Sequence, residues 1–165
     1  MSQAGLIGTS AMPPPVTGSV GFQALIGASQ PAVTGDGTAL TVVFDAVVWE
    51  TGGNNYDPLT GIFTVPSDGK YLVNYSLTLT DVASGNTSST FLIGGSLGTA
   101  SITVTNPGAA HVGGFYYITN SFLIDITAGA TIFVNGSVSG TGMTVGLQGE
   151  AFGQYSYFSI IKLAD

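Results

Sequence analysis

The stretch NNYDPLTGIFTVPSDGKYL, residues 54–72, decides how this chain is expected to fold. It holds two Asp, two Gly, two Pro and three aromatic residues, so it suits either an active-site loop or a piece of β structure. Asn and Asp hydrogen-bond to their own backbone and Pro fixes φ, which predicts turns at 54–58 and 66–69. A strand is expected around Phe63, and the next begins at Tyr71. Because Asp57 and Asp68 stand where turns favour Asp, we interpret the stretch as scaffold.

Outside this stretch the chain alternates between strands and turns. Residues 70–80 show the clearest period of two, with apolar side chains at Tyr71, Val73, Tyr75, Leu77 and Leu79. Other strands are expected at 21–27, 38–50, 61–66, 89–95, 99–105, 113–126, 130–138, 141–149 and 155–163. The run 38–50 is long enough for two strands joined by a bend, and 28–37 is expected to be a loop. About nine or ten short strands with regular turns predict an all-β sandwich or barrel.

The length and the N-terminal composition indicate one domain with a leader. A chain of 165 residues is long enough for one sizeable core. Residues 1–19 are rich in Gly, Ser and Thr and contain three consecutive Pro, so they are expected to form a flexible leader or linker. The domain is expected over 20–165. The leader lacks the basic region and long apolar run of a signal peptide, which favours another export route or assembly onto something else.

Charge and composition exclude several functions. The chain has two Lys, no Arg and nine acidic residues, a net charge of −7. Nucleic acids and anionic membranes need clustered cations, so we expect neither as a partner. No stretch of 18 apolar residues occurs, so no membrane span is expected. Without Cys there is no disulfide, thiolate or ordinary zinc site. Only 7% of the residues are charged, which suits a chain that hides much of its surface in an oligomer.

Candidate catalytic and metal-binding residues are few. Asp57 and Asp68 could form the carboxylate pair of a glycosidase, but their turn setting favours a structural role. His111 is the single His, in a loop-like stretch without a triad signature, and is expected to be solvated or at most a pH-sensitive contact. The Asp-rich loop that binds calcium is absent, so no cofactor or metal is predicted. Calcium held jointly by carboxylates of three subunits is the remaining alternative.

Two Tyr-rich segments, 113–117 and 153–157, allow two interpretations. Exposed, they would form a recognition surface, because Tyr binds sugars and proteins well. Buried, they would be cross-strand pairs of the core, and their strand-like setting favours this second interpretation. Glycosylation sequons occur at Asn74, Asn86 and Asn135, and they matter only in a eukaryotic secretory route.

The 56–71 block, Tyr-Asp-Pro-x-Thr-Gly-x-Phe-Thr-x-Pro-x-x-Gly-x-Tyr, closely resembles the C1q globular-domain family, relatives of the tumour necrosis factor jelly roll. The similarity extends over about residues 20–165, including 121–134 and 146–149. It implies a ten-stranded jelly-roll sandwich that assembles as a compact homotrimer. The residues that carry the structural motif are Phe44, Tyr56, Gly61, Phe63, Pro66, Gly69, Tyr71 and Phe158.

Three strands carry apolar residues on both faces, which supports the trimer independently. A two-sheet sandwich usually leaves one face of each strand polar. The segments VVFDAVVWE, NSFLIDI and SYFSIIKL break this rule, and neighbouring subunits around a threefold axis would cover their outer faces. The residues expected at this trimer interface are Trp49, Leu123, Ile160 and Ile161.

The function that these features favour is a non-enzymatic trimeric head domain for attachment or ligand recognition at a cell, phage or virus surface. Its partners would be copies of itself and a glycan or protein receptor, and its ligand-binding residues cannot be assigned from the sequence. The location expected is extracellular or on a particle such as a virion, a phage tail or a bacterial appendage. A purely structural trimerisation cap of a fibre is the first alternative, and a carbohydrate-active enzyme is the second.

Overall fold

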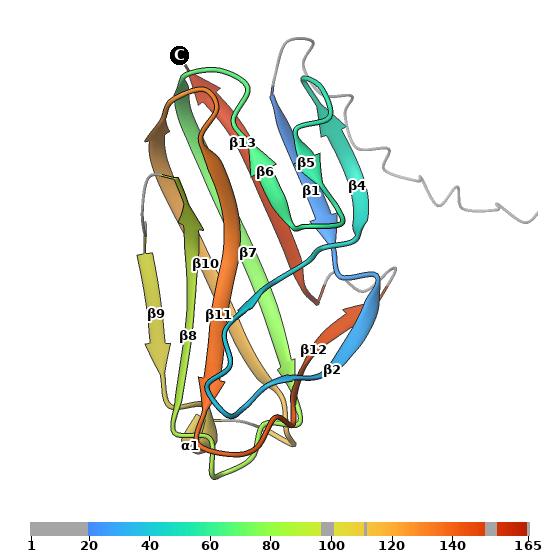
Figure 1. Ribbon diagram of the computed structural model, residues 1–165, viewed down its shortest axis with the longest axis vertical. Coiled ribbons are helices and arrows are strands. Elements are labelled where there is room, and N and C mark those ends of the chain that lie inside the picture. Colours follow the sequence, from blue (N-terminus) through green and yellow to red (C-terminus); the bar gives the residue numbers. More distant parts are fainter. Residues whose placement is uncertain (1–19, 97–100, 111, 151–154, 165) are drawn as a thin grey trace, which may run out of the picture.

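The computed structural model describes residues 20–96, 101–110, 112–150 and 155–164, and these form two packed β sheets (Figure 1). The elements in chain order are β1 Gly21–Leu25, β2 Ala28–Thr34, β3 Leu40–Thr41, β4 Ala46–Thr51, β5 Tyr56–Asp57, β6 Ile62–Thr64, β7 Gly69–Thr80, β8 Ser88–Gly95, β9 Ser101–Thr105, α1 Pro107–Ala110, β10 Tyr116–Ile126, β11 Thr131–Ser139, β12 Val145–Glu150 and β13 Tyr157–Ala164. The all-β prediction is confirmed. The strands outnumber the nine or ten expected because short strands such as β3 and β5, of two residues each, flank the turns.

Sheet A has seven strands and is organised around β7. Strand β10 pairs with one edge of β7 along its whole length. On the other edge, β13 pairs with the first part of β7 and β12 with its end. The remaining order runs from β13 through β1 to β4, while β2 pairs with β12. All these pairs are antiparallel, so successive side chains of each strand point alternately toward the core and away from it.

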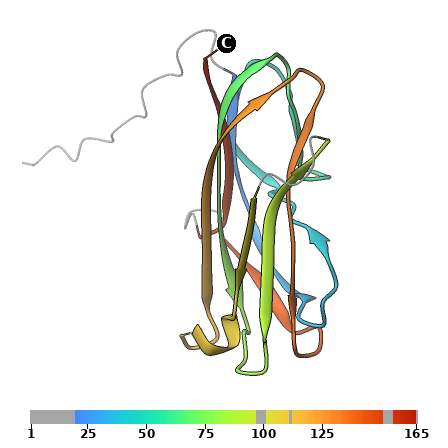
Figure 2. The same ribbon diagram turned by 90° about the vertical axis from the view of Figure 1, so that its left-hand side faces the viewer.

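Sheet B has six strands in the order β5, β6, β11, β8 and β9, with β3 also paired to β11. The two sheets lie face to face as separate layers, seen along their edges in Figure 2. Tyr75 of β7 joins them, because its hydroxyl donates a 3.0 Å hydrogen bond to the carbonyl oxygen of Phe91 in β8.

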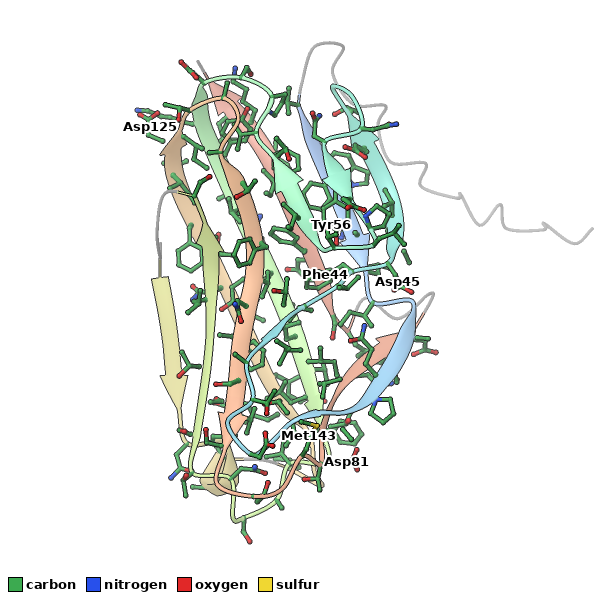
Figure 3. The ribbon with its side chains drawn as sticks, in the orientation of Figure 1. Phe44, Asp45, Tyr56, Asp81, Asp125 and Met143 are labelled. Carbon is green, nitrogen blue, oxygen red and sulfur yellow. The ribbon has the colours of Figure 1, made fainter. Side chains whose placement is uncertain are left out.

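The core between the sheets is built on an aromatic cluster at the 54–72 stretch. The rings of Phe22 and Tyr56 stack with centroids 4.3 Å apart, and Phe158 meets Phe22 edge-on at 5.1 Å. The Tyr56 hydroxyl donates to the carbonyl oxygen of Phe44 at 2.9 Å and accepts from the Phe44 N–H at 3.2 Å (Figure 3). Burial raises the pKa of Tyr56, so the phenol keeps its proton and its role as donor.

Two glycines of the same stretch have φ values that favour glycine. Gly61 has φ 75° and Gly69 has φ 148°, as their predicted turn positions require. A Cβ at position 61 would lie 2.5 Å from the carbonyl oxygen of Val42, so the chain also needs the space that Gly leaves. Phe63 and Tyr71 are fully buried, which confirms that both point into the sandwich.

One sequence-based prediction fails in sheet A. Residues 28–34, expected to be a loop, form strand β2. This strand contains Pro31, which cannot donate a backbone hydrogen bond, but β2 lies at the edge of the sheet and pairs only with β12. An edge position tolerates Pro because one side of the strand needs no partner. The bend expected within 38–50 is confirmed, since β3 and β4 are separate strands.

Candidate functional site

The outer face of sheet A, which points away from sheet B, carries large apolar side chains that are exposed. Ile118 and Ile126 of β10 are buried in the core, so the alternate residues of this strand point outward. Leu123 is 63% exposed and Tyr117 is also 63% exposed, high values for large apolar side chains on a regular strand. Such residues on neighbouring strands mark an interaction surface when they lie together.

An apolar row crosses the half of this face that lies nearer to Lys70 and Asp125, which we call the upper half. Leu72 of β7 lies directly opposite Leu123 of β10 on one side and Ile161 of β13 on the other. Gly21 of β1 is the next partner of Ile161 and adds no side chain to the row. Ile161 is 36% exposed. We call Leu72, Leu123 and Ile161 the self-contact row.

A polar row runs beside the self-contact row, one step further along the same strands. Its members, in register across the sheet, are Trp49, Gln23, Ser159, Asn74 and Ser121. The Trp49 Nε1–H donates to Gln23 Oε1 at 3.2 Å, and Ser121 Oγ donates to Asn74 Oδ1 at 2.6 Å. These two bonds satisfy the Trp49 N–H and the Ser121 hydroxyl, so another surface can cover these two donors without leaving them unpaired.

The outer face is almost free of charge between its two ends. At the upper end Lys70 and Asp125 lie opposite each other on β7 and β10. Below them the outward positions of the two strands are uncharged: Leu72, Asn74, Ser76 and Thr78 on β7, and Leu123, Ser121, Thr119 and Tyr117 on β10. In a chain with net charge −7, these uncharged positions let two copies approach at this face without strong repulsion.

A concave site lies at the lower end of the face, where β7 exchanges β13 for β12 as its partner. It encloses about 230 Å³ and is lined by Thr78, Phe115, Tyr117, Gln148, Glu150 and Tyr155, which we call the aromatic pocket. Tyr155 is 46% exposed and Phe115 is 42% exposed.

Hydrogen bonds fix the floor of the aromatic pocket. The Thr78 hydroxyl donates to the carbonyl oxygen of Tyr155 at 2.9 Å, and the Thr78 N–H donates to Ser156 Oγ at 3.1 Å. Ser156 Oγ in turn donates to the carbonyl oxygen of Gln148 at 2.7 Å. Thr78 and Ser156 are both buried, and these bonds join β7, β12 and the segment before β13.

The aromatic pocket corrects the interpretation of the Tyr-rich segments as buried core pairs. Phe115, Tyr117 and Tyr155 are exposed, and only Tyr116 packs against the core from these segments. The alternation of side chains along a strand could have predicted this exposure. Tyr117 is the immediate neighbour of the apolar Ile118, so the two side chains must point to opposite faces.

Of the four residues predicted for the trimer interface, three reach the outer face and one does not. Leu123 and Ile161 belong to the self-contact row and Trp49 to the polar row, so all three reach the outer face. The prediction is wrong for Ile160. This side chain is fully buried and lies opposite Val73, another fully buried residue, because neighbours along a strand face opposite sides.

The two carboxylates of the 54–72 stretch support turns. Asp57 Oδ1 accepts from the Leu59 N–H at 2.9 Å, and Oδ2 accepts from the Thr60 hydroxyl at 2.7 Å. These bonds, the Leu59 N–H first, lower the pKa of Asp57. Asp68 Oδ1 accepts from the Ala128 N–H at 2.7 Å and so ties its turn to the one before β11. Pro66 of the same stretch is exposed.

Other predicted features add no further candidate. His111 and residues 1–19 lie outside the described residues. Within the described ranges, no three His, Asp or Glu side chains gather closely enough to hold a metal ion. Among the same residues, no helix is both long and apolar enough to cross a bilayer. The sequon residue Asn86 is fully buried, with its amide bonded to Thr141.

Comparison with known proteins settles the family. The C1q domain model matches residues 24–159, most of the chain. The chain belongs to the C1q domain family. Its fold is shared with a crystal structure of murine APRIL at pH 8.0, with a TM-score of 0.62, 13% identity, and coverage of 88% of this chain and 99% of that one. The globular domain of zebrafish complement 1qA matches with a TM-score of 0.60, 10% identity and coverage of 89% and 99%. No curated protein matches the sequence.

The resemblance stated from the 56–71 block is thereby confirmed, as is the C1q/TNF-like jelly roll. Members of the C1q family are typically non-enzymatic recognition modules and are typically extracellular. Members of the C1q and tumour necrosis factor families usually form trimers.

Proposed function

We propose that this chain is a non-enzymatic recognition head that assembles as a homotrimer and is displayed on the surface of a cell, phage or virus. The observation that supports the assembly most strongly is the self-contact row. Its members Leu72, Leu123 and Ile161 align across three strands of the outer face. A monomer would leave the exposed part of this apolar row in water, and covering that part contributes a share of the about 1.5–3 kcal/mol that full burial of one such side chain gives.

Copies of the same chain are the occupant that the outer face suits best. The uncharged positions below Lys70 and Asp125 allow several chains of net charge −7 to approach without strong repulsion. Covering the Ser121 hydroxyl costs little because it already donates to Asn74 Oδ1. The common trimeric state of the family supports a closed threefold arrangement over an open one.

Recognition, in this account, gains strength from trimerisation. Three identical heads on one particle engage repeated surface ligands together, which raises avidity without new contacts. The purely structural cap would need the self-contact row alone and would leave the aromatic pocket without a role.

Paired substitutions test the assembly and recognition together. Leu123→Lys places a charge in the self-contact row, whereas Leu59→Lys places one at a turn residue that is 87% exposed. We expect Leu123→Lys to give a folded monomer by light scattering and circular dichroism, with weakened binding to host cells or a glycan array. Leu59→Lys is expected to stay trimeric and to bind as the unmodified chain does. A trimeric Leu123→Lys protein would contradict the interface, and a trimer that binds no surface ligand would favour the cap.

A further inference from the structure

The outer face of sheet B, which points away from sheet A, is the face that the proposed trimer leaves open. The two sheets form separate layers (Figure 2), and sheet B is the layer nearer the viewer in Figure 1. In the trimer, copies that meet at the self-contact row cover the outer face of sheet A instead. Strand β11 is the middle strand of sheet B. Its residues Ile132 and Val134 are buried in the core, so Phe133 points to the outside, where its side chain is half-buried.

The Phe133 ring leans across the neighbouring strand and rests on Gly94. The two residues lie opposite each other on β11 and β8. A Cβ at position 94 would lie 2.7, 3.0 and 3.3 Å from three carbons of this ring, so the ring occupies the space above the glycine. One side of the ring is therefore held against the sheet, and the other side is left for an external contact. The face of an aromatic ring is negative and attracts the slightly positive C–H groups of another molecule.

Polar side chains with free hydrogen-bonding groups surround this ring. Asn135 is two residues further along β11, about 6.6 Å away, and points to the same side. Its amide makes no hydrogen bond to any described residue, and neither does the hydroxyl of Thr41, which lies opposite it on β3. Thr64 of β6, beyond the other side of the ring, is exposed, and its hydroxyl is likewise unpaired within the described ranges. In the polar row of sheet A, by contrast, the Trp49 N–H and the Ser121 hydroxyl are already bonded.

Sheet B carries almost no charge. Asp57 is the single charged residue within its six strands, and its carboxylate already accepts from the Leu59 N–H and the Thr60 hydroxyl. An acidic ligand would be repelled by a chain of net charge −7 and would find no Lys within these strands to hold it. A cationic ligand would find no free carboxylate there. The charge distribution therefore matches a neutral ligand.

We propose that Phe133, Asn135, Thr41 and Thr64 form a platform that binds a neutral pyranose of a surface glycan, an inference that rests on the proposed recognition function and gives it a ligand class. A pyranose carries C–H groups on its ring face and hydroxyls around its rim. The C–H face stacks on Phe133. The Asn135 amide, with two N–H donors and an acceptor oxygen, bonds the rim hydroxyls, and the two Thr hydroxyls can each donate and accept.

A glycan suits this platform better than a second copy or another protein. An apolar protein surface would cover the Asn135 amide and the Thr41 and Thr64 hydroxyls without giving them partners, which is costly. A sugar brings a hydroxyl to each of these groups. Three platforms on the outside of one trimer would engage repeated glycans together, which raises avidity.

The test is an NMR titration of the full isotope-labelled chain with three neutral sugars: methyl β-glucoside, methyl β-galactoside and methyl α-mannoside. Methyl β-glucuronide, the carboxylate analogue of the glucoside, reports the effect of negative charge. Sorbitol, an open-chain polyol without a ring face, reports the contribution of stacking. We expect weak but saturable binding of at least one neutral pyranoside, with shifts of the Phe133 ring signals and the Asn135 amide signals. The glucuronide and sorbitol should bind several-fold more weakly than that pyranoside.

Substitutions locate the site. Phe133→Leu still covers Gly94 but removes the ring, so pyranoside binding should weaken by about two- to ten-fold, the factor that corresponds to one aromatic contact. Asn135→Ala should weaken binding with little change in melting temperature, because the amide bonds to no described residue. Ser139→Ala is the matched control, on the same strand and face but about 20 Å from Phe133, and should bind like the unmodified chain.

The inference fails if none of the three pyranosides binds saturably, if sorbitol or the glucuronide binds as tightly, or if Phe133→Leu and Asn135→Ala bind like the unmodified chain. A trimer that binds no pyranoside but still binds host cells would refute this ligand class and leave the recognition function standing. Loss of that binding after protease treatment of the cells would then identify a protein receptor. A monomer that binds a pyranoside with the expected variant effects would confirm the platform and contradict the trimer.

Discussion

Leu72 and Leu123 lie directly opposite each other on β7 and β10, and both point away from the core of the sandwich. With Ile161 on the next strand they form an apolar row on a sheet face that no other part of the described chain covers. A jelly roll that worked alone would place polar residues here, as the other face of an antiparallel sheet usually does. The row is the physical basis for expecting assembly.

Adjacent residues of β13 separate assembly from folding. Ile161→Ala removes part of the self-contact row, so we expect a folded chain whose trimer dissociates at higher protein concentrations than the unmodified protein. Ile160→Ala empties a fully buried position and is expected to lower the free energy of unfolding by about 2–5 kcal/mol. Sedimentation at several dilutions and urea unfolding of both variants measure the two effects. Equal effects of the two substitutions on unfolding would show that Ile161 belongs to the core.

Tyr56→Phe isolates the hydrogen bonds at the centre of the aromatic cluster. The ring can keep its stacking on Phe22, but the Phe44 N–H and carbonyl oxygen lose their shared partner. Buried polar groups left without a partner cost about 1–3 kcal/mol, so urea unfolding should show a loss of this size. An unchanged midpoint would mean that water or a shifted backbone replaces the hydroxyl.

Gly61→Ala tests the backbone of the fold-determining stretch. The new Cβ would meet the Val42 carbonyl oxygen at 2.5 Å, at a φ of 75° that L residues rarely adopt. We expect a clear fall in melting temperature. The corresponding loss of unfolding free energy should exceed the about 1 kcal/mol that is typical of a conformational preference alone. Gly142→Ala is the matched control, because nothing lies within 4 Å of its Cβ and its φ is not positive. Equal melting temperatures for the two variants would contradict the account of this turn.

Asp57 and Asp68 are expected to behave as turn residues. Replacing either by Ala should leave a folded trimer with its ligand binding intact, whereas Phe63→Ala should lower stability by about 3–5 kcal/mol and cause aggregation. The folded-state pKa of Asp57 is lowered, so its stabilising effect is complete above the ordinary carboxyl pKa and disappears as the pH falls through the lower folded value. Asp57→Asn should therefore reduce the dependence of melting temperature on pH in this acidic range. An Asp57→Ala protein that melts normally but loses a defined activity would make the loop functional.

The strands and their inward residues could be predicted from the sequence because they depend on local patterns. The period of two in 70–80 places Tyr71, Tyr75 and Leu79 in the core, where the structure has them. Strand β2 could not be predicted, since Gly and Pro around it indicate a loop and its pairing partner, β12, lies more than 100 residues away in the chain. Its existence depends on a long-range contact.

The site was harder to predict than the fold. Leu123 and Ile161 could be recognised because both occur in strands with apolar residues on each face, but the choice between Ile160 and Ile161 needs the register of β13 against β7. The aromatic pocket joins residues from β7, β10, β12 and the segment before β13. No spacing within the sequence indicates that these four segments meet, because the switch from β13 to β12 along β7 is a tertiary feature.

The mass of the unmodified protein in solution tests the central claim most directly. Light scattering on a dilution series down to micromolar concentration should give a value close to three times the 16.6 kDa chain mass, as one homogeneous species. A single species at 16.6 kDa over the whole series would contradict the self-contact row as an assembly surface and the trimeric recognition head with it.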